Sequence, residues 1–232
     1  MEKPQWPWRQ VLIAGASGLV GRALLTRLLQ GPADHRVISI GRRKLPAEFT
    51  AARAEQAGAR GPSLEERIVD FRHLEGLPPL DPVFITLGTT IKGAGSPQAF
   101  RAVDFDAVVA VARAGRAAGA SRLGVVSAMG ADAQSSVFYN RVKGEMEAAV
   151  AALGYACVVI ARPSLIEGDR AALQQPGRAG ESWALHLARV ARPLLPRHLR
   201  SIAADDIAAG LLERVAAGAP GVHIVPSGDL QR

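Results

Sequence analysis

The sequence contains little of what several protein classes require. Its single cysteine, Cys157, excludes an internal disulfide, and it lies in the apolar run Ala156 to Ala161, where a small buried thiol is expected. No stretch approaches the roughly 20 uninterrupted apolar residues that a membrane-crossing helix needs. Residues 1–10 contain no apolar core of the kind found in signal peptides. We therefore expect a cytoplasmic protein with no membrane partner.

Histidines and aromatic residues are also too sparse to indicate a metal or a nucleic acid. The five histidines, at positions 35, 73, 186, 198 and 223, show no metal-ligand spacing such as HxxxH and have no cysteine partners. The net charge of +7 is compatible with nucleic acid, an acidic membrane or a phosphorylated ligand. Because the basic residues are scattered and aromatics make up only 5% of the chain, we expect neither bound metal nor a nucleic-acid partner.

The composition and the apolar pattern predict one α/β domain. A chain of 232 residues can surround a single hydrophobic core, and its 48% hydrophobic content is that of an ordinary globular protein. Short runs rich in Val and Ile alternate with longer helical segments, which is typical of a parallel sheet covered on both faces. The sequence therefore predicts a doubly wound parallel sheet spanning residues 1–232, with loops and a helix at 164–204 on the substrate side.

The same pattern gives the expected elements. The predicted strands are Gln10 to Ala14, Arg36 to Ile40, Glu66 to Asp70, Val83 to Leu87, Arg122 to Ser127, Ala156 to Arg162 and Val222 to Val225. The predicted helices are Val20 to Leu29, Gln98 to Ala118, Phe138 to Leu153, Trp183 to Ala191 and Asp205 to Ala217. Segment 45–64 is compatible with either a surface helix or a long loop.

The first predicted strand runs directly into a glycine-rich turn and a helix. Lacking Cβ atoms, Gly15 and Gly18 can let the chain turn sharply and approach a pyrophosphate, while Gly21 allows close packing of helix on strand. The helix N-terminus directs free N–H groups and its positive dipole end at the anion. The turn predicts a Rossmann-type dinucleotide site made by Gly15, Ser17, Gly18, Leu19, Val20 and Gly21.

The end of the second predicted strand bears on the choice of cofactor. An acidic residue there accepts the ribose hydroxyls of NAD, whereas arginine favours the additional phosphate of NADP. The chain has Arg42 and Arg43 at this place and no carboxylate beside them, so it predicts NADP(H) in preference to NAD(H). The alternative is a solvated basic turn. After the third strand, Asp70 and Phe71 are expected to contact the adenine ring.

The stretch from Ser127 to Tyr139 and Lys143, following the glycine turn, resembles the short-chain dehydrogenase/reductase family. It is most similar to the short atypical branch of Tat-interactive oxidoreductase-like proteins, and the similarity spans nearly the whole chain. The further matching elements are Leu87-Gly88-Thr89-Thr90, Lys143-Gly-Glu and Arg162-Pro163. The resemblance implies that Leu87, Gly88, Thr89, Thr90, Tyr139, Lys143, Pro163 and Ile166 contact the cofactor.

The spacing of the proposed catalytic residues has a chemical reason. Residues four apart share one helix face, so Tyr139 and Lys143 project toward the same pocket. A nearby ammonium stabilises a phenolate and so helps a tyrosine to exchange protons. The resemblance implies that Lys143 also holds the nicotinamide ribose, and that Ser127 donates to a substrate oxygen. Taken alone, the Tyr139–Lys143 spacing is equally compatible with an ordinary surface helix.

One departure from the family pattern leaves the function open. Many relatives have an asparagine in the helix before the fifth strand, which completes a proton relay, whereas this chain has Asp104 and Asp106. Either aspartate can replace the asparagine, or the relay is incomplete. The leading hypothesis is an oxidoreductase acting on a small carbonyl or alcohol. The alternatives are an NADP(H)-binding sensor and, because few residues follow Ile166, less favoured epimerase or dehydratase action on a nucleotide sugar.

The substrate itself is not predicted by the sequence. Its pocket is expected to be lined by two loop-prone segments, Gly168 to Trp183 and Leu194 to Ile202, where Arg178 or Arg197 can attract an anion. The direction of the reaction and the oligomeric state stay open.

Overall fold

The computed structural model describes residues 6–49, 62–74, 76–167 and 200–231. Seven strands form one parallel sheet in the order β3-β2-β1-β4-β5-β6-β9. These strands are β1 (Gln10–Ala14), β2 (Arg36–Gly41), β3 (Ser63–Ile68), β4 (Val83–Ile85), β5 (Arg122–Val126), β6 (Cys157–Arg162) and β9 (Gly221–Pro226). This is the doubly wound Rossmann architecture that the sequence predicts.

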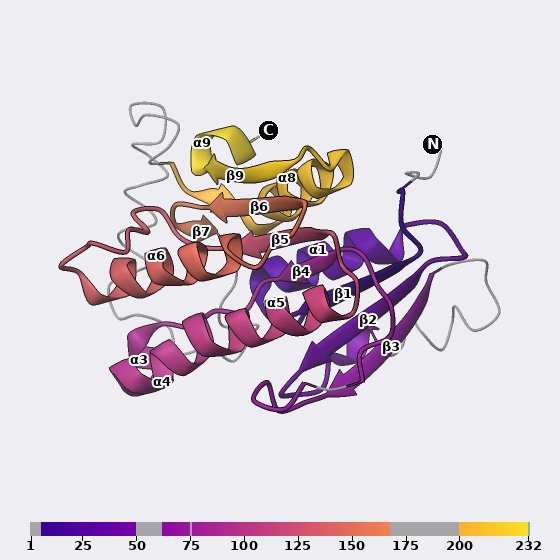
Figure 1. Cartoon of the computed structure of the whole chain (residues 1–232), viewed down its shortest axis with the longest axis horizontal. Coiled ribbons are helices and arrows are strands. Elements are labelled where there is room, and N and C mark those ends of the chain that lie inside the picture. The colour runs from indigo at the N-terminus through magenta and orange to yellow at the C-terminus, as the bar shows by residue number, and fades with distance from the viewer. Residues whose placement is uncertain (1–5, 50–61, 75, 168–199, 232) are drawn as a thin grey trace.

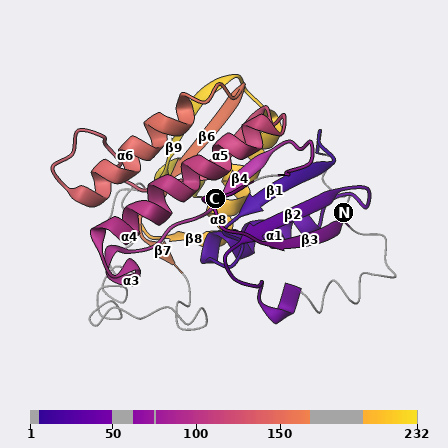
Figure 2. The same ribbon diagram turned by 60° about the horizontal axis from the view of Figure 1, so that its bottom comes forward.

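Helices cover both faces of this sheet (Figure 1). The helices are α1 (Leu19–Leu29), α3 (Ile91–Ala94), α4 (Pro97–Arg101), the π-helix η1 (Ala102–Ala107), α5 (Val108–Ala117), α6 (Phe138–Ala151), α8 (Ala204–Ala217) and α9 (Ser227–Leu230). One hydrophobic cluster joins the sheet to α1 and α8, through residues such as Leu24 and Leu211. A second joins the opposite face to α5 and α6, which run side by side in Figure 2, through residues such as Val111 and Met146. The buried Cys157 belongs to the first cluster, as expected of a packing residue.

Some boundaries differ from the sequence prediction. The third strand begins at Ser63 instead of Glu66, and the helix predicted at 98–118 consists of α4, η1 and α5 in succession. A small parallel pair, β7 (Ile166–Glu167) and β8 (Ile202–Ala203), was not predicted. The helix predicted at Trp183 to Ala191, most of the 164–204 extension, and both Arg178 and Arg197 lie outside the described residues. The prediction of a single domain stays a prediction.

The strand order places a crevice at the carboxyl ends of the central strands. Strand β1 pairs with β2 on one side and with β4 on the other, so the order of strands along the chain reverses at β1. In open parallel sheets, ligands bind outside the carboxyl ends of the strands at such a reversal. The glycine turn follows β1, and the segment 87–90 follows β4, so both predicted loops meet at this crevice.

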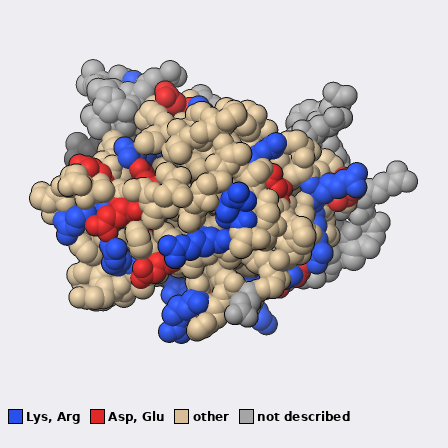
Figure 3. Space-filling model, viewed as in Figure 1, with Lys and Arg blue, Asp and Glu red and all other residues tan. Residues whose placement is uncertain are grey.

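Charge is mixed on the face of the molecule shown in Figure 3, and the described residues contain neither a membrane-spanning helix nor a cluster of metal ligands. On the face shown in Figure 3, basic side chains are interspersed with acidic ones over a largely uncharged surface. Within the described ranges, no helix combines the length and the apolar character needed to span a membrane. The same ranges contain no group of three or more His, Cys, Asp or Glu side chains placed to hold a metal ion.

Candidate functional site

Two glycines of the turn are required by the fold itself. Gly15 has a φ of 93°, in the left-handed region, and a Cβ there would lie 2.8 Å from the backbone of Thr86 and Leu87. A Cβ on Gly21 would lie 2.1 Å from the carbonyl oxygen of Gly15. Glycine at these positions therefore lets β1, the segment after β4 and α1 pack against one another.

Gly18 is different, because the chain does not need glycine there. Its φ of −82° and ψ of 170° are open to any residue, which corrects the expectation that Gly18 provides the sharp turn. The nearest atom to an added Cβ would be the carbonyl oxygen of Gly15 at 3.5 Å, an ordinary contact. Gly18 lines a cavity of about 390 Å³. Because glycine has no side chain, the space beside Gly18 stays open within this cavity.

That cavity brings together many of the predicted cofactor-binding residues. Those lining it are Gly15, Ser17, Gly18, Arg42, Arg43, Phe71, Leu87 and Gly88. Leu19 and Val20 lie in the first turn of α1, and Val20 is buried against the core. Beyond Gly88, the backbone N–H of Thr89 donates to Asp104 and the Thr90 hydroxyl caps α3. The turn, the end of β2 and the segment after β4 thus share one cavity.

The end of this cavity next to β2 is basic. Arg42, Arg43 and Lys44 all line it, their side chains are exposed, and within the described residues none of them makes an ion pair. Glu66 also lines the cavity, and its carboxylate accepts a hydrogen bond from the Leu45 N–H. The sequence analysis missed Glu66 because it depends on the parallel register that sets it opposite Ser39.

The two residues predicted to contact adenine have different surroundings. Phe71 is buried and lines the cavity, whereas Asp70 does not line it. Asp70 binds the exposed Arg72 instead, with Arg72 Nη2 at 2.6 Å from Asp70 Oδ2. The hydrogen bonds from Arg72 lower the pKa of Asp70 to about 2. Phe71 is therefore the better placed of the two to meet a planar base.

Ser127 lies directly after β5 with a buried hydroxyl. The residue is 5% exposed, and its N–H donates to the carbonyl oxygen of Ala161 at 2.8 Å, which ties it to β6. Its Oγ has no hydrogen-bond partner among the described residues. A buried hydroxyl without a partner has lost its hydrogen bonds to water, so the Ser127 Oγ is available to donate to an atom that the described residues do not supply.

Lys143 is buried on the inner face of α6 and paired with Asp104. The residue is 3% exposed, and its Nζ lies 2.7 Å from Oδ1 of Asp104, which is fully buried in η1. The other carboxylate oxygen accepts the N–H of Thr89 at 2.9 Å. Burial raises the pKa of Asp104, and the ammonium of Lys143 opposes that shift.

The structure decides which of the two aspartates lies at the site. Asp104 points inward to Lys143, whereas Asp106 on the same π-helix is exposed. The extra residue per turn of a π-helix shifts the faces of the elements before and after it, a feature that occurs often at functional sites. Of the two aspartates, Asp104 is therefore the one that contacts the proposed catalytic lysine.

Tyr139 is the second residue of the same helix, one turn before Lys143. Its side chain is partly exposed, and its ring packs against the fully buried Phe100 with the centroids 5.3 Å apart. Its hydroxyl makes no hydrogen bond in the part of the chain that the structure describes. An apolar contact therefore orients the ring and leaves the hydroxyl available.

A second buried ion pair fixes the position of α6. Glu147, one turn after Lys143 and 5% exposed, accepts three hydrogen bonds from Arg162 at the end of β6, one of them 3.0 Å from Nε to Oε1. This carboxylate raises the pKa of the Arg162 guanidinium. Next to Arg162, the carbonyl oxygen of Pro163 accepts the N–H of Met129 at 2.9 Å, and Ile166 pairs with Ile202. The strand end is thus tied to both the α6 helix and the segment after Ser127.

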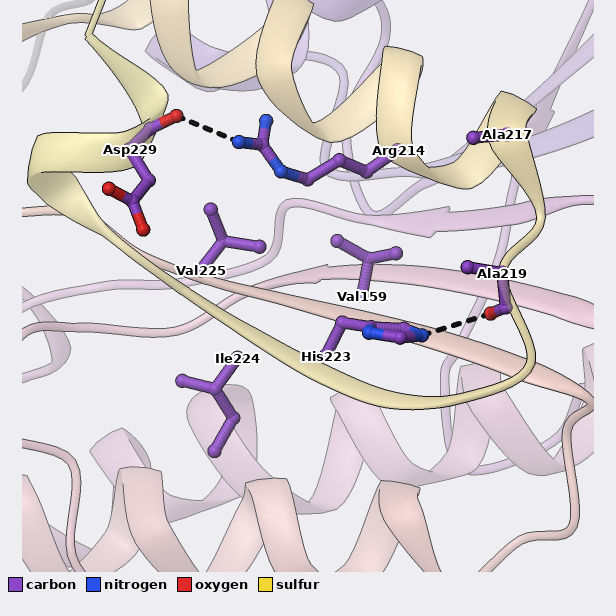
Figure 4. Close-up of a pocket in the computed structure, with 8 residues that line it drawn as sticks. All are labelled: Val159, Arg214, Ala217, Ala219, His223, Ile224, Val225 and Asp229. Atoms are coloured by element: carbon purple, nitrogen blue, oxygen red, sulfur yellow. Dashed lines mark hydrogen bonds between the residues drawn. The ribbon is translucent and has the colours of Figure 1, made fainter.

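A second cavity, of about 300 Å³, lies between α8, β9 and α9 and contains none of the predicted site residues (Figure 4). Two of its polar side chains, those of Arg214 and His223, are already bound within the fold. Arg214 Nη2 donates to the carbonyl oxygen of Asp229 at 2.8 Å, and His223 Nε2 lies 3.0 Å from that of Ala219. The candidate functional site is therefore the crevice at β1, β4 and β5.

The parallel sheet and this crevice define a Rossmann fold of the nucleotide-binding oxidoreductase type. The L-sorbose reductase from Gluconobacter frateurii, solved with NADPH and L-sorbose, has this fold, with a TM-score of 0.66 at 19% identity over 97% of both chains. No protein-family model matches the sequence.

Curated relatives identify the family. Protein fmp52, mitochondrial, of Emericella nidulans is 37% identical over 161 residues, which are 69% of this chain and 68% of that protein. Protein HTATIP2 of Rattus norvegicus is 36% identical over 177 residues, 75% of this chain and 67% of that protein. The chain therefore belongs to the short-chain dehydrogenase/reductase family, in the atypical branch that contains HTATIP2 and fmp52.

These relatives contradict the predicted cytoplasmic location. The fmp52 proteins of Emericella nidulans, Aspergillus fumigatus and Aspergillus clavatus are all named as mitochondrial. The prediction was based on the missing apolar leader. Mitochondrial targeting segments are amphipathic and basic instead of apolar, so that criterion does not exclude the mitochondrion.

Proposed function

We propose that this protein is an NADPH-dependent oxidoreductase that transfers hydride to or from a small carbonyl or alcohol substrate. The observation that carries the proposal is the Ser127 hydroxyl, which is buried at the carboxyl end of β5 and has no hydrogen-bond partner among the described residues. A substrate oxygen bound at this position would accept its hydrogen bond. Charge that develops on that oxygen during reduction would strengthen the bond, which is how such donors accelerate a reaction.

The cavity beside the glycine turn supports the nucleotide part of the proposal. The open space at Gly18 suits a pyrophosphate against the backbone, and Arg42 and Arg43 suit a 2′-phosphate because neither is engaged with a carboxylate of the described residues. NADPH supplies the hydride when bound. The solved L-sorbose reductase, which shares the fold, carries this same cofactor.

Three side chains have the proposed catalytic roles. Tyr139 donates its hydroxyl proton to the substrate oxygen in reduction and takes a proton back in oxidation. Ser127 donates a hydrogen bond to the same oxygen. Lys143 holds the cofactor ribose and orients the reacting groups, and its own position is fixed by Asp104. The ion pair between Glu147 and Arg162 holds α6 against the end of β6.

The experiment that tests catalysis is Tyr139→Phe, assayed by NADPH consumption with a panel of aldehydes, ketones and quinones. Removing only the hydroxyl should abolish reduction and leave NADPH affinity unchanged. The matched control is Tyr155→Phe, because Tyr155 is buried and its hydroxyl donates to the Ala112 carbonyl oxygen at 2.6 Å. A panel compound reduced as fast by Tyr139→Phe as by the unmodified protein would remove Tyr139 from the mechanism.

The cofactor preference is tested by titrating NADPH and NADH into the free protein. NADPH should bind more tightly, and Arg42→Ala with Arg43→Ala should remove about tenfold of that preference per arginine, since both are exposed. Arg113→Ala, which removes an exposed charge on α5, is the control. Equal affinities in the unmodified protein would contradict the preference and indicate that Glu66 accepts the ribose hydroxyls.

One observation favours a second function, that of an NADP(H)-binding sensor. The ammonium of Lys143 is ion-paired with a carboxylate in place of the asparagine of many relatives. A site altered in this way can retain nucleotide binding and lose turnover. Tight NADPH binding with no reaction across the panel, together with unchanged binding by Tyr139→Phe, is the result that would favour this function.

A further inference from the structure

A further arginine lines the cavity beside the glycine turn. Arg22 lies in α1, shortly after the turn, and shares the cavity with Arg42 and Arg43. Its Nε donates to the carbonyl oxygen of Ser17 at 3.3 Å. This hydrogen bond fixes one side of the Arg22 guanidinium against the glycine turn.

The other side of the guanidinium meets the segment that follows the basic end of β2. Arg22 Nη1 lies 3.5 Å from Oε1 of Glu48. Glu48 comes shortly after Lys44, and the intervening Leu45 and Pro46 also line the cavity. In a Rossmann site the pyrophosphate binds at the glycine turn and the ribose 2′ position lies at the end of the second strand. Arg22 therefore spans the two places between which the adenosine ribose of a dinucleotide lies.

The ion pair between Arg22 and Glu48 is weak. The Glu48 side chain is 59% exposed, and 3.5 Å is long beside the about 2.7–2.9 Å of a strong charge-assisted hydrogen bond. Arg27 on the same helix differs, because it binds Asp205 through two hydrogen bonds. Exposed single-contact pairs contribute little to the stability of a fold. A stronger anion can therefore replace Glu48 at little cost to the protein.

Arg22 retains donors for such an anion. A guanidinium carries five N–H donors in a planar fork. Arg22 uses Nε for Ser17 and Nη1 for Glu48, and its Nη2 makes no hydrogen bond to the described residues. A phosphate monoester presents three acceptor oxygens and a charge of about −1.5 to −2 at neutral pH, whereas a carboxylate has two oxygens and one charge. The phosphate is therefore the better partner for this guanidinium.

We propose that Arg22 binds the 2′-phosphate of NADP(H) and that Glu48 competes with this phosphate for the guanidinium. In the free protein Glu48 occupies Arg22, and the 2′-phosphate displaces it. NAD(H) has no such phosphate and leaves the pair intact, so Arg22 adds to the discrimination that Arg42 and Arg43 provide. The inference rests on the proposed function, because it requires a nicotinamide dinucleotide in the cavity.

The first test is calorimetric titration of NADPH and NADH into Arg22→Gln. Removing the guanidinium should weaken NADPH binding about tenfold and change NADH binding by less than about twofold. The matched control is Arg27→Gln, which removes an arginine from the same helix at a position outside the cavity, where it binds Asp205. This control should bind both nucleotides as the unmodified protein does.

The second test removes the competitor and has the opposite sign. Glu48→Gln should tighten NADPH binding about threefold, the size expected for an exposed pair, and leave NADH binding unchanged. In the Arg22→Gln background the same substitution should have no effect, because the group for which Glu48 competes is gone. Asp34→Asn is the matched control, since it breaks another exposed pair of 3.5 Å, with Arg9, away from the cavity.

The results separate this inference from the proposed function. If neither nucleotide binds the unmodified protein, both fail. If NADPH binds tightly and Arg22→Gln weakens neither nucleotide, or weakens both by the same factor, the assignment of the 2′-phosphate to Arg22 is overturned and the proposed function stands. NADPH binding that Glu48→Gln does not tighten, or tightens equally without Arg22, overturns the competition. Circular dichroism verifies folding, and Glu48→Gln, at an exposed position, decides the question if Arg22→Gln does not fold.

Discussion

The two halves of the crevice treat charge in opposite ways. Beside β2, Arg42 and Arg43 are exposed and have no ion pair among the described residues. Beside α6, Lys143 is buried and bound to Asp104. A charge kept free in water can move to meet an anionic group of a ligand, whereas a buried pair holds one geometry. The half beside β2 is therefore suited to attracting an anionic group of a ligand, and the half beside α6 is suited to holding its side chains in one geometry.

The glycines show the same division. Gly15 and Gly21 are required by contacts within the chain, and Gly18 is not. One turn thus contains two glycines that the packing of the chain requires and one, Gly18, that leaves space open beside the backbone. Substitutions that separate these two kinds of position test the comparison directly.

Breaking the buried pair should have the largest effect. Lys143→Met leaves the Asp104 carboxylate buried without its partner, which should lower the free energy of unfolding by about 3–5 kcal/mol. Loss of the ammonium raises the pKa of Asp104 further, so the folded state binds the proton more tightly than the unfolded state. The deficit should therefore shrink as the pH falls, measured by urea unfolding at several pH values. A deficit equal at all pH values would show that Asp104 carries no buried charge.

The two glycines of the turn should differ clearly when each is changed to valine. Gly21→Val should cost about 3 kcal/mol, because the new side chain collides with the Gly15 carbonyl. Gly18→Val should cost about 1 kcal/mol, the difference expected at a helix N-cap, and should abolish NADPH binding. Thermal unfolding and nucleotide titration measure the two effects. Full NADPH affinity in Gly18→Val would assign the open space to some other use.

Ser127→Ala should have almost no effect on stability and a large one on turnover. The hydroxyl has no partner in the described residues, so removing it should change the free energy of unfolding by less than about 0.5 kcal/mol, or stabilise the fold slightly. Turnover should fall by roughly ten- to a thousandfold through loss of a donor to the substrate oxygen. Unchanged turnover would remove Ser127 from the site.

A small pH effect is expected far from the crevice, at His35. Burial lowers the pKa of His35, with Asp34 opposing the shift. The unfolded chain then binds the proton more readily, so this residue's contribution to stability is present at neutral pH and declines as the pH falls below about 6.5. His35→Gln should flatten that slope in urea unfolding, whereas His73→Gln, at an exposed histidine, should not. Equal slopes in all three proteins would contradict the effect.

Much of the fold was predictable because strong periodic signals decide it. The central strands and α1, α6 and α8 appear close to their predicted bounds, since the apolar pattern and the glycines agree there. The choice of Asp104 over Asp106 was not predictable, because a π-helix breaks the period of 3.6 residues on which helix faces are assigned. Glu66 was missed at the cavity because cross-strand register is not contained in local sequence.

The pairing of Arg162 with Glu147 was missed for a related reason. The resemblance assigned Pro163, directly after Arg162, to the cofactor, and nothing in the local pattern showed that the Arg162 guanidinium would be bound by α6. Long-range partners depend on how each helix lies across the sheet. The sequence predicted the class of architecture but not the position of each helix on the sheet. The residues 168–199, expected to shape the substrate pocket, lie outside the described part of the chain.

The packing of α1 against α8 has a consequence for synthesis on the ribosome. Arg27 and Asp205 are joined by two hydrogen bonds although 178 residues separate them, and the apolar Leu24 and Leu28 share a cluster with Ile207 and Leu211. A nascent chain therefore carries α1 without its cover until α8 has emerged. Domains stabilised by contacts between distant segments fold late in synthesis, and they expose apolar surface until the second segment is available. We therefore expect α1 to pack stably only after α8 has been synthesised.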